Sequence, residues 1–219
     1  MQNLSSSPLR PGTATDDVLS LLRASIRDGH FAPGQRLIEA DLMDSFKVTR
    51  GPLREALRRL ASEGIVDIVP NRGARVRSFS RQEMRDLFRI REVVEGLAAR
   101  QAAEVMANEK NQNKFAAAFE RIEQRRLQTN LPFSKENVLF HELVLTHAKN
   151  RQLTDLMRQL QLPLVRLQIR ASVDDSYREA SRREHDAVGR AIIVGNPDKA
   201  ELLMRRHLRR AAQRVMGKI

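Results

Sequence analysis

The sequence predicts a mainly α-helical protein in two parts: an N-terminal domain of three helices with one β-hairpin, and a C-terminal bundle of six helices. Three observations support this fold class. Apolar residues recur at helical spacing along most of the 219-residue chain. Only residues 65–77 show the β-branched strands and central turn of a hairpin. From residue 81 onward the pattern is helical throughout, with breaks at Gly, Pro and Asn.

The composition is that of a globular protein with room for two small domains. Apolar residues make up 41% of the chain and charged residues 30%. No apolar run approaches the roughly 18 residues of a membrane span, and the first residues lack a signal peptide, so we expect a cytoplasmic protein without membrane contact. The absence of cysteine excludes disulfides, thiolate catalysis and Cys-based zinc sites.

The net charge of +12 indicates an acidic partner, but only weakly identifies it as nucleic acid. Residues 1–80 hold 12 Lys and Arg against 9 Asp and Glu, a net of +3, so the excess lies in the second part. The assignment must therefore depend on where individual charges are placed.

The N-terminal domain is predicted to span residues 13–78, after a disordered tail at 1–12. Its first helix should begin at Thr15 and carry Val18, Leu21, Leu22 and Ile26 on its buried face. Gly29 ends this helix. A turn, an extended piece at 35–37 and a second helix at 39–46 should follow, with Leu42, Met43 and Phe46 facing inward.

Residues 49–61 form the helix around which this domain is organised. Thr49 is a suitable N-cap and Pro52 falls in the first turn. Three leucines at helical spacing face a core, and Arg50, Arg54 and Arg58 follow at steps of four on the adjoining flank. The pattern suits contact with a polyanion. The alternative is an ordinary solvated helix with spare arginines.

The neighbouring elements favour DNA. Two short helices joined by a tight turn at residues 47–48 form a helix-turn-helix, whose second helix enters the major groove with its leading residues at the base edges. The hairpin that follows is a wing, and its tip at Asn71, Arg72 and Gly73 can approach a phosphate backbone closely. Taken alone, this tip would more often be a plain exposed turn.

This stretch resembles the winged domain of the GntR family of bacterial transcription regulators. The resemblance covers about sixty residues, and its matching positions are Pro33-Gly34, Arg36-Leu37, Glu39, Leu42, Val48-Thr49-Arg50, residues 52–57, Leu60, Glu63-Gly64 and residues 71–73. It implies that Arg50 and Arg54 contact DNA, with Thr49 and Gly51 near the backbone and the wing at Arg72 and Gly73. Some relatives carry a DNA-reading Arg in the second helix, where this chain has Ala40, so part of the readout must differ.

The second part, residues 83–219, follows a linker at 79–82 in which Ser80 resembles a helix cap. We predict six helices near 81–107, 111–129, 134–148, 151–173, 176–195 and 197–216, with a kink at Pro163. These helices would pack together into a bundle.

Three histidines lie on apolar faces of three different predicted helices: His141, His185 and His207. Each taken alone would most simply be a hydrogen-bonded core histidine. Three converging neutral imidazoles can instead share one divalent cation, such as zinc, nickel or manganese. Asn137, one turn before His141, could supply a fourth ligand.

The second part also resembles the all-helical FCD effector domain of the FadR subgroup, and its six helices are similar to the VanR-type branch. The matching positions are Arg91, Glu95, residues 98–100, Phe140-His141, residues 148–150, Glu184-His185, Ala191-Ile192 and His207-Leu208. The resemblance implies a metal held by an acid and three histidines, beside which a small organic acid docks. This chain has Asn137 where an Asp is commonest. Arg91 is our candidate for the effector carboxylate, and the alternative is an intrahelical ion pair with Glu95.

We therefore predict a ligand-responsive repressor that binds double-stranded DNA at an inverted repeat as a homodimer. One alternative is a metal-dependent hydrolase using the three histidines, although no HExxH or GxSxG motif supports it. The other is a nonspecific architectural DNA-binding protein.

Overall fold

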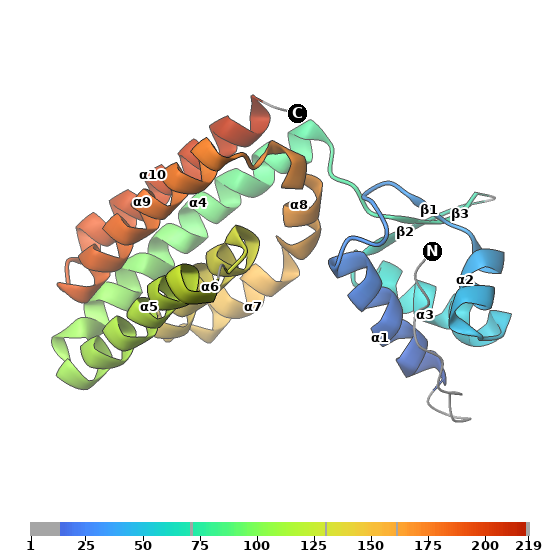
Figure 1. The fold of residues 1–219 in the computed structure, drawn as a ribbon, viewed down its shortest axis with the longest axis horizontal. Coiled ribbons are helices and arrows are strands. Elements are labelled where there is room, and N and C mark those ends of the chain that lie inside the picture. The colour runs from blue at the N-terminus through green and yellow to red at the C-terminus, as the bar shows by residue number, and fades with distance from the viewer. Residues whose placement is uncertain (1–13, 71, 130, 161, 218–219) are drawn as a thin grey trace. The chain divides into compact units, whose positions relative to one another are not determined.

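The computed structural model describes residues 14–217 apart from Asn71, Asn130 and Gln161. The predicted disordered tail lies outside these residues. The described chain is mainly helical with one small sheet, which confirms the predicted fold class (Figure 1). It divides into two compact units, Met1–Phe79 with Gln161–Gln168 and Ser80–Leu160 with Ile169–Ile219. Within the described residues, no helix is both long and apolar enough to span a bilayer.

Among its described residues, the first unit contains four helices and a three-stranded antiparallel sheet in the order β1-β3-β2. Its elements are α1 (Ala14–Arg27), β1 (Arg36–Leu37), α2 (Glu39–Phe46), α3 (Arg50–Ser62), β2 (Val66–Val69), β3 (Gly73–Val76) and α8 (Leu162–Gln168). In the sheet, Ala74 of β3 pairs with Leu37 on one side and with Ile68 on the other. The predicted extended piece, second helix and hairpin are thus present.

The core of this unit forms between α1, α3 and the sheet, where Leu22, Leu53 and Val76 are fully buried. The predicted inner face of α1 was wrong at one position. Leu21 is 41% exposed, and Leu19 is buried instead. Since both leucines fit an apolar stripe, the packing of α1 against α3 decides which of them turns inward.

The turn between α2 and α3 depends on Lys47, whose backbone is left-handed with φ 54°. This conformation ends α2 and directs the chain into α3 within two residues. Thr49 occupies the N-cap position with an extended backbone, but its side chain makes no capping hydrogen bond. The predicted N-cap position of Thr49 is therefore confirmed, but its side chain does not cap the helix, and Thr49 is exposed at the start of α3.

The second unit contains six α-helices among the described residues. They are α4 (Arg81–Glu104), α5 (Glu109–Thr129), α6 (Phe133–His147), α7 (Arg151–Gln159), α9 (Asp175–Ile193) and α10 (Pro197–Met216), with short 3-10 helices at Val105–Ala107 and Arg170–Ser172. Ser80 and Glu83 form a capping box at the start of α4. The helix therefore begins at Arg81, as the predicted helix near 81–107 does, and the last two residues of the predicted linker at 79–82 belong to it.

The predicted helix at 151–173 is broken rather than kinked. It becomes α7 and α8, because Pro163 lacks a backbone N–H and disfavours helical geometry at the preceding residue. The segment Gln161–Gln168 also clusters with the first unit, although we predicted it as part of the bundle. Leu164 of α8 is buried in the core of the first unit, and the Gln168 side chain bonds both the N–H and the carbonyl of Phe79.

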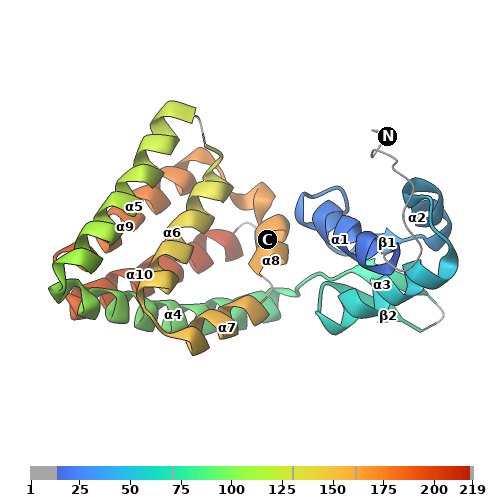
Figure 2. The same ribbon diagram turned by 90° about the horizontal axis from the view of Figure 1, so that it is seen from below.

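The long helix α4 is the central element of the second unit. It packs along α10 and also contacts α6 and α9, as the two views show (Figures 1 and 2). Gly96 permits the close approach of α10, since a Cβ atom there would lie 2.5 Å from Cγ of Arg205. The helices α6, α9 and α10, which bear the three histidines, are thus assembled in one unit.

Candidate functional site

The predicted DNA-contacting arginines lie on the outer face of α3. The side chains of Arg50, Arg54 and Arg58 are 66%, 53% and 70% exposed. None is buried against the core, which is formed by the opposite face of the helix through Leu53, Leu57 and Leu60. This division of the helix into a packed face and a cationic face agrees with the sequence pattern.

Each of these arginines faces one carboxylate of the protein. Arg54 Nε donates to both oxygens of Glu39, at 3.0 and 3.1 Å. Arg50 Nε lies 3.8 Å from the same carboxylate, and Arg58 lies 3.5 Å from Glu55. We did not predict the pairing of Glu39 with Arg54, although the glutamate at the start of the preceding helix was a visible signal.

The remaining predicted contacts also lie at the surface. Thr49 and Gly51 are exposed at the start of α3, and Arg72 and Gly73 are exposed at the hairpin tip. Gly73 has φ 79°, a conformation that favours glycine. A Cβ atom on Gly51 would meet nothing within 4 Å, so packing within the protein does not require glycine there.

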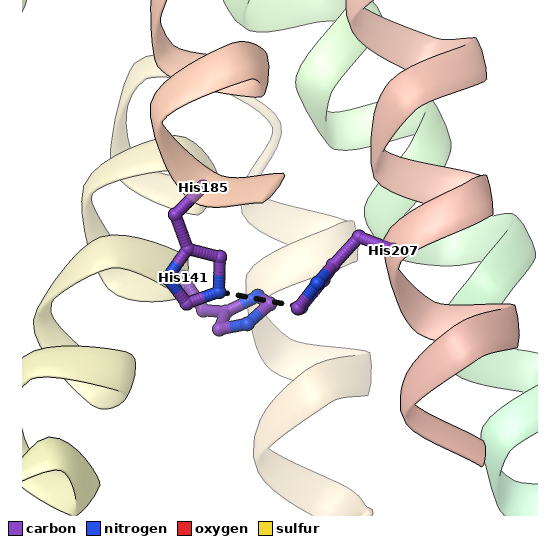
Figure 3. Close-up of side chains that lie close together, drawn as sticks. All are labelled: His141, His185 and His207. Carbon is purple, nitrogen blue, oxygen red and sulfur yellow. Dashed lines mark hydrogen bonds between the residues drawn. The ribbon is translucent and has the colours of Figure 1, made fainter. Parts of the chain in front are cut away.

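The three predicted histidines converge inside the second unit (Figure 3). His141 comes from α6, His185 from α9 and His207 from α10, and all three are buried. One ring nitrogen from each lies within 4.8 Å of those of the other two, and Nε2 of His185 is 3.3 Å from Nε2 of His207. The prediction that these side chains point inward is confirmed.

Two carboxylates orient this cluster from outside. Glu95 Oε2 lies 2.5 Å from Nδ1 of His141, while Arg91 Nε donates to the other oxygen of Glu95 at 2.7 Å. Nδ1 of His207 donates to Glu184 at 2.8 Å, and Arg214 holds the same carboxylate. In both rings Nδ1 faces a carboxylate, which leaves Nε2 as the ligand atom, an arrangement typical of metal-binding histidines.

The electrostatics of the cluster favour neutral rings at His141 and His185 and charged carboxylates at Glu95 and Glu184. Burial lowers the pKa of His141 to about 4, and burial also holds the pKa of His185 well below its ordinary value. Burial acts to raise the pKa of Glu95, but the charges of Arg91 and His141 outweigh it and hold that pKa far below the usual range. The same balance, with hydrogen bonds from His207 and Arg214, lowers the pKa of Glu184 to about 2.

These residues fit a divalent metal ion. Two nitrogens bound to one tetrahedral zinc at roughly 2.0–2.1 Å lie about 3.3 Å apart, and the two Nε2 atoms of His185 and His207 are 3.3 Å apart. Neutral imidazoles are the protonation state that metal binding requires. Within the described residues, the hydroxyl of Ser181, one turn before His185, is buried without a hydrogen-bond partner.

Two other predicted residues have different outcomes. Arg91 forms the intrahelical ion pair with Glu95 that we weighed as the alternative to effector binding. Asn137 is partly buried one turn before His141, and its role as a ligand stays a prediction. We did not predict Glu95 and Glu184 as partners of the histidines, because Glu95 and His141, like Glu184 and His207, lie on separate helices, and such contacts leave no local pattern in the sequence.

Comparison with known proteins identifies both units. Residues 14–76 match the family of bacterial regulatory proteins of the gntR type, and residues 86–210 match the FCD domain. The chain is 27% identical over 215 residues to the HTH-type transcriptional repressor RspR of Escherichia coli (strain K12), covering 95% of this chain and 91% of the relative. It is 25% identical over 185 residues to the HTH-type transcriptional regulator YdhC of Bacillus subtilis (strain 168), covering 82% and 81%.

Solved structures show the same fold. A GntR transcriptional regulator from Rhodococcus sp. RHA1 superposes with a TM-score of 0.73 at 24% identity, covering 94% of this chain and 99% of that one. McbR/YncC of E. coli superposes with a TM-score of 0.71 at 18% identity, covering 94% and 98%. With an exposed arginine face on α3 and these matches across both units, the chain belongs to the GntR family of bacterial DNA-binding transcription regulators and carries an FCD domain.

Proposed function

We propose that this regulator is a ligand-responsive repressor that binds an inverted-repeat operator as a homodimer. A small carboxylate bound beside a divalent metal in the second unit would change the affinity of the protein for DNA. The observation that carries this proposal is the buried cluster of His141, His185 and His207 within the FCD domain of a DNA-binding protein. An architectural DNA-binding protein would have no use for such a cluster.

The DNA contact is proposed for the exposed face of α3. Arg50, Arg54 and Arg58 present cationic side chains along that face, and guanidinium groups read guanine edges or bind phosphates. The exposed backbone at Thr49 and Gly51 would approach the duplex. A Cβ atom on Gly51 would meet nothing within 4 Å, so the space beside Gly51 is open to a partner.

The wing is proposed as a second contact. Its tip carries Arg72 and Gly73, both exposed, and the left-handed backbone of Gly73 permits a tight turn. An arginine at such a tip supplies positive charge to a phosphate or the minor groove.

The metal would be held by His141, His185 and His207, with Asn137 as a fourth ligand. Zinc, nickel and manganese all accept imidazole nitrogen. Because imidazole and amide ligands are neutral, a bound dication would keep a positive charge and attract a carboxylate. The outer carboxylates of Glu95 and Glu184 would hold the rings in the required orientation.

Arg91 is proposed to help bind the carboxylate of the effector. Arg91 is buried. Burial is the largest cause that lowers the pKa of His185, the charges of His207 and His141 come next, and the charge of Arg91 adds a smaller contribution. Arg91 therefore lies within electrostatic range of the cluster. The ion pair with Glu95 occupies Nε of Arg91, which leaves its remaining N–H groups for a ligand. The unpartnered hydroxyl of Ser181 lies on the same side of α9 as His185 and would suit a second polar contact.

The homodimer is proposed because two-fold symmetry matches an inverted repeat. In support, Ile90, Val93 and Leu97 line one face of α4 and are 45%, 54% and 38% exposed. Exposed apolar residues at helical spacing suit an interface with a second copy.

The test is a thermal-shift screen of small carboxylic acids with and without zinc, nickel or manganese, combined with elemental analysis of the purified protein. We expect about one divalent ion per chain, and an acid that raises the melting temperature only when the metal is present. A metal-free protein whose melting temperature ignores all three ions would overturn the metal site. A shift with acid alone would overturn the coupling of effector to metal.

A further inference from the structure

The carboxylate of Glu39 joins the two leading arginines of α3 to the preceding helix. Glu39 is the first residue of α2, and its side chain is 30% exposed. It accepts two hydrogen bonds from Nε of Arg54 and lies 3.8 Å from Nε of Arg50. The positive end of the α2 dipole stabilises the charge of Glu39 in this place.

This contact holds the guanidinium of Arg54 by its Nε edge. Glu39 occupies the Nε edge of the guanidinium, and among the described residues Arg54 has no other ion-pair partner. The four N–H groups on the Nη nitrogens stay available, and two parallel bonds from a guanidinium to O6 and N7 are the commonest reading of guanine. A side chain already held in one orientation loses less freedom when it binds.

We propose that Glu39 is a positioning residue for sequence reading, which orients Arg54, and more loosely Arg50, toward base edges. This inference rests on the proposed contact of Arg54 with DNA. It assigns to α2 a part in specificity through a residue that itself bears the wrong charge for touching phosphates.

The sign of the effect separates positioning from plain electrostatics. A carboxylate beside a phosphate backbone repels it, so a purely electrostatic view predicts that neutralising Glu39 strengthens binding to every sequence. A positioning role predicts weaker binding to the operator alone. The two views therefore give opposite results for one variant.

The chain offers a matched control on the same surface. Glu55 lies 3.5 Å from Arg58 within α3, and both side chains are more than half exposed. Its removal eliminates one negative charge next to an arginine of the same face, and it leaves the contacts of Arg54 intact. Any general charge effect must therefore appear in Glu55→Gln as well.

The experiment uses the full-length protein and an operator selected in vitro from random duplexes with the unmodified protein. Fluorescence anisotropy measures the affinity of Glu39→Gln, Glu39→Ala, Glu55→Gln and Arg54→Ala for that operator, for its single-base variants and for random DNA. Thermal unfolding of each variant confirms that it is folded. We expect Glu39→Ala to lower the ratio of operator to random affinity by about tenfold, with a smaller loss for Glu39→Gln, whose amide oxygen can still accept from Arg54.

The positions affected complete the test. The loss should be confined to the base pairs at which Arg54→Ala also loses discrimination, whereas a general distortion of the domain would weaken every position. Equal strengthening on operator and random DNA by the Glu39 variants, or a ratio unchanged from that of Glu55→Gln, overturns the positioning role while the contact of Arg54 stands. An Arg54→Ala variant that keeps full discrimination overturns the DNA contact of Arg54 and this inference with it.

Discussion

Two Arg–Glu pairs in this regulator have similar geometry and opposite surroundings. In the first unit, Arg54 Nε lies 3.0 Å from Glu39, and the two side chains are 53% and 30% exposed. In the second unit, Arg91 Nε lies 2.7 Å from Glu95, and the two side chains are only 10% and 2% exposed. The comparison shows that burial, rather than contact distance, determines what such a pair does.

The exposed pair leaves part of its arginine available to another partner. Water screens its attraction, such pairs contribute about 0–1 kcal/mol to stability, and Glu39 occupies only Nε of Arg54, so a nucleic acid can bind the Nη groups. The buried pair has no such access to water or to a macromolecule, and removing one partner leaves an uncompensated charge away from water. It therefore serves as a fixed support, which here holds His141 through the second oxygen of Glu95.

Breaking the buried pair should have the largest effect. Glu95→Gln leaves the charge of Arg91 uncompensated and weakens the support of His141, and we expect the free energy of unfolding to fall by about 3–5 kcal/mol. Urea unfolding measures this change. As a control, Glu104→Gln removes an exposed partner of Arg100 on the same helix and should change little. A loss below about 1 kcal/mol for Glu95→Gln would show that water reaches the pair.

The next largest effect is expected from lowering the pH, which should reduce the stability of the second unit through its buried histidines and glutamates. His141 has a folded pKa of about 4, below its ordinary value of 6.5, so the unfolded chain binds more protons in between. The contribution of His141 to the free energy of unfolding is then fully present above about pH 6.5. It declines as the pH falls toward about 4, by about 1.4 kcal/mol for each unit of pKa shift. The lowered pKa values of Glu95 and Glu184 extend the decline to lower pH.

Unfolding of chelator-treated protein between pH 7.5 and 4.5 measures this slope, and the exposed His30 provides the control. The variant His30→Ala should keep the full decline, because His30 lies outside the buried cluster. A stability that stays flat over this range would contradict the burial of neutral imidazoles.

Breaking the exposed pair from its arginine side should affect DNA rather than folding. We expect Arg54→Ala to weaken operator binding by about 1–3 kcal/mol if Arg54 reads a base, while the free energy of unfolding changes by about 1 kcal/mol at most. Anisotropy with operator and random DNA separates base reading from phosphate contact. Equal losses on both duplexes would identify a phosphate contact instead.

The smallest effect is expected at the pair of Glu55 and Arg58. Both side chains are exposed and lie three residues apart on α3, with Nη1 of Arg58 3.5 Å from Oε2 of Glu55. Glu55→Gln should change the free energy of unfolding by about 0.5 kcal/mol or less, as thermal unfolding at low and high salt can measure. A larger, salt-sensitive loss would place this pair with the buried one and weaken the comparison.

The sequence predicted the features that depend on local pattern. The helix at Glu39–Phe46 was found because a tight turn follows it directly in the sequence. The cap at Ser80 was found because a capping residue lies next to the start of its helix. The three histidines were found because a polar ring on an apolar helix face stands out from its neighbours. These signals need no knowledge of which helices touch.

Features that depend on approach between distant segments were missed. Glu39 meets Arg54 across the turn between two helices, and Glu95 meets His141 from a different helix. The choice between Leu19 and Leu21 also depended on how α1 rests on α3. Spacing along one helix cannot encode such pairings, because both partners must be placed by the tertiary fold.

The position of Leu164 has a practical consequence for experiments that divide this regulator. A fragment ending at Phe79 would lack α8, so the apolar surface that Leu164 covers would be open to water, and the backbone of Phe79 would lose its two bonds to Gln168. Chimaeric proteins that join the first unit to another sensor domain should therefore include residues 162–168 as a second segment, in addition to the N-terminal segment.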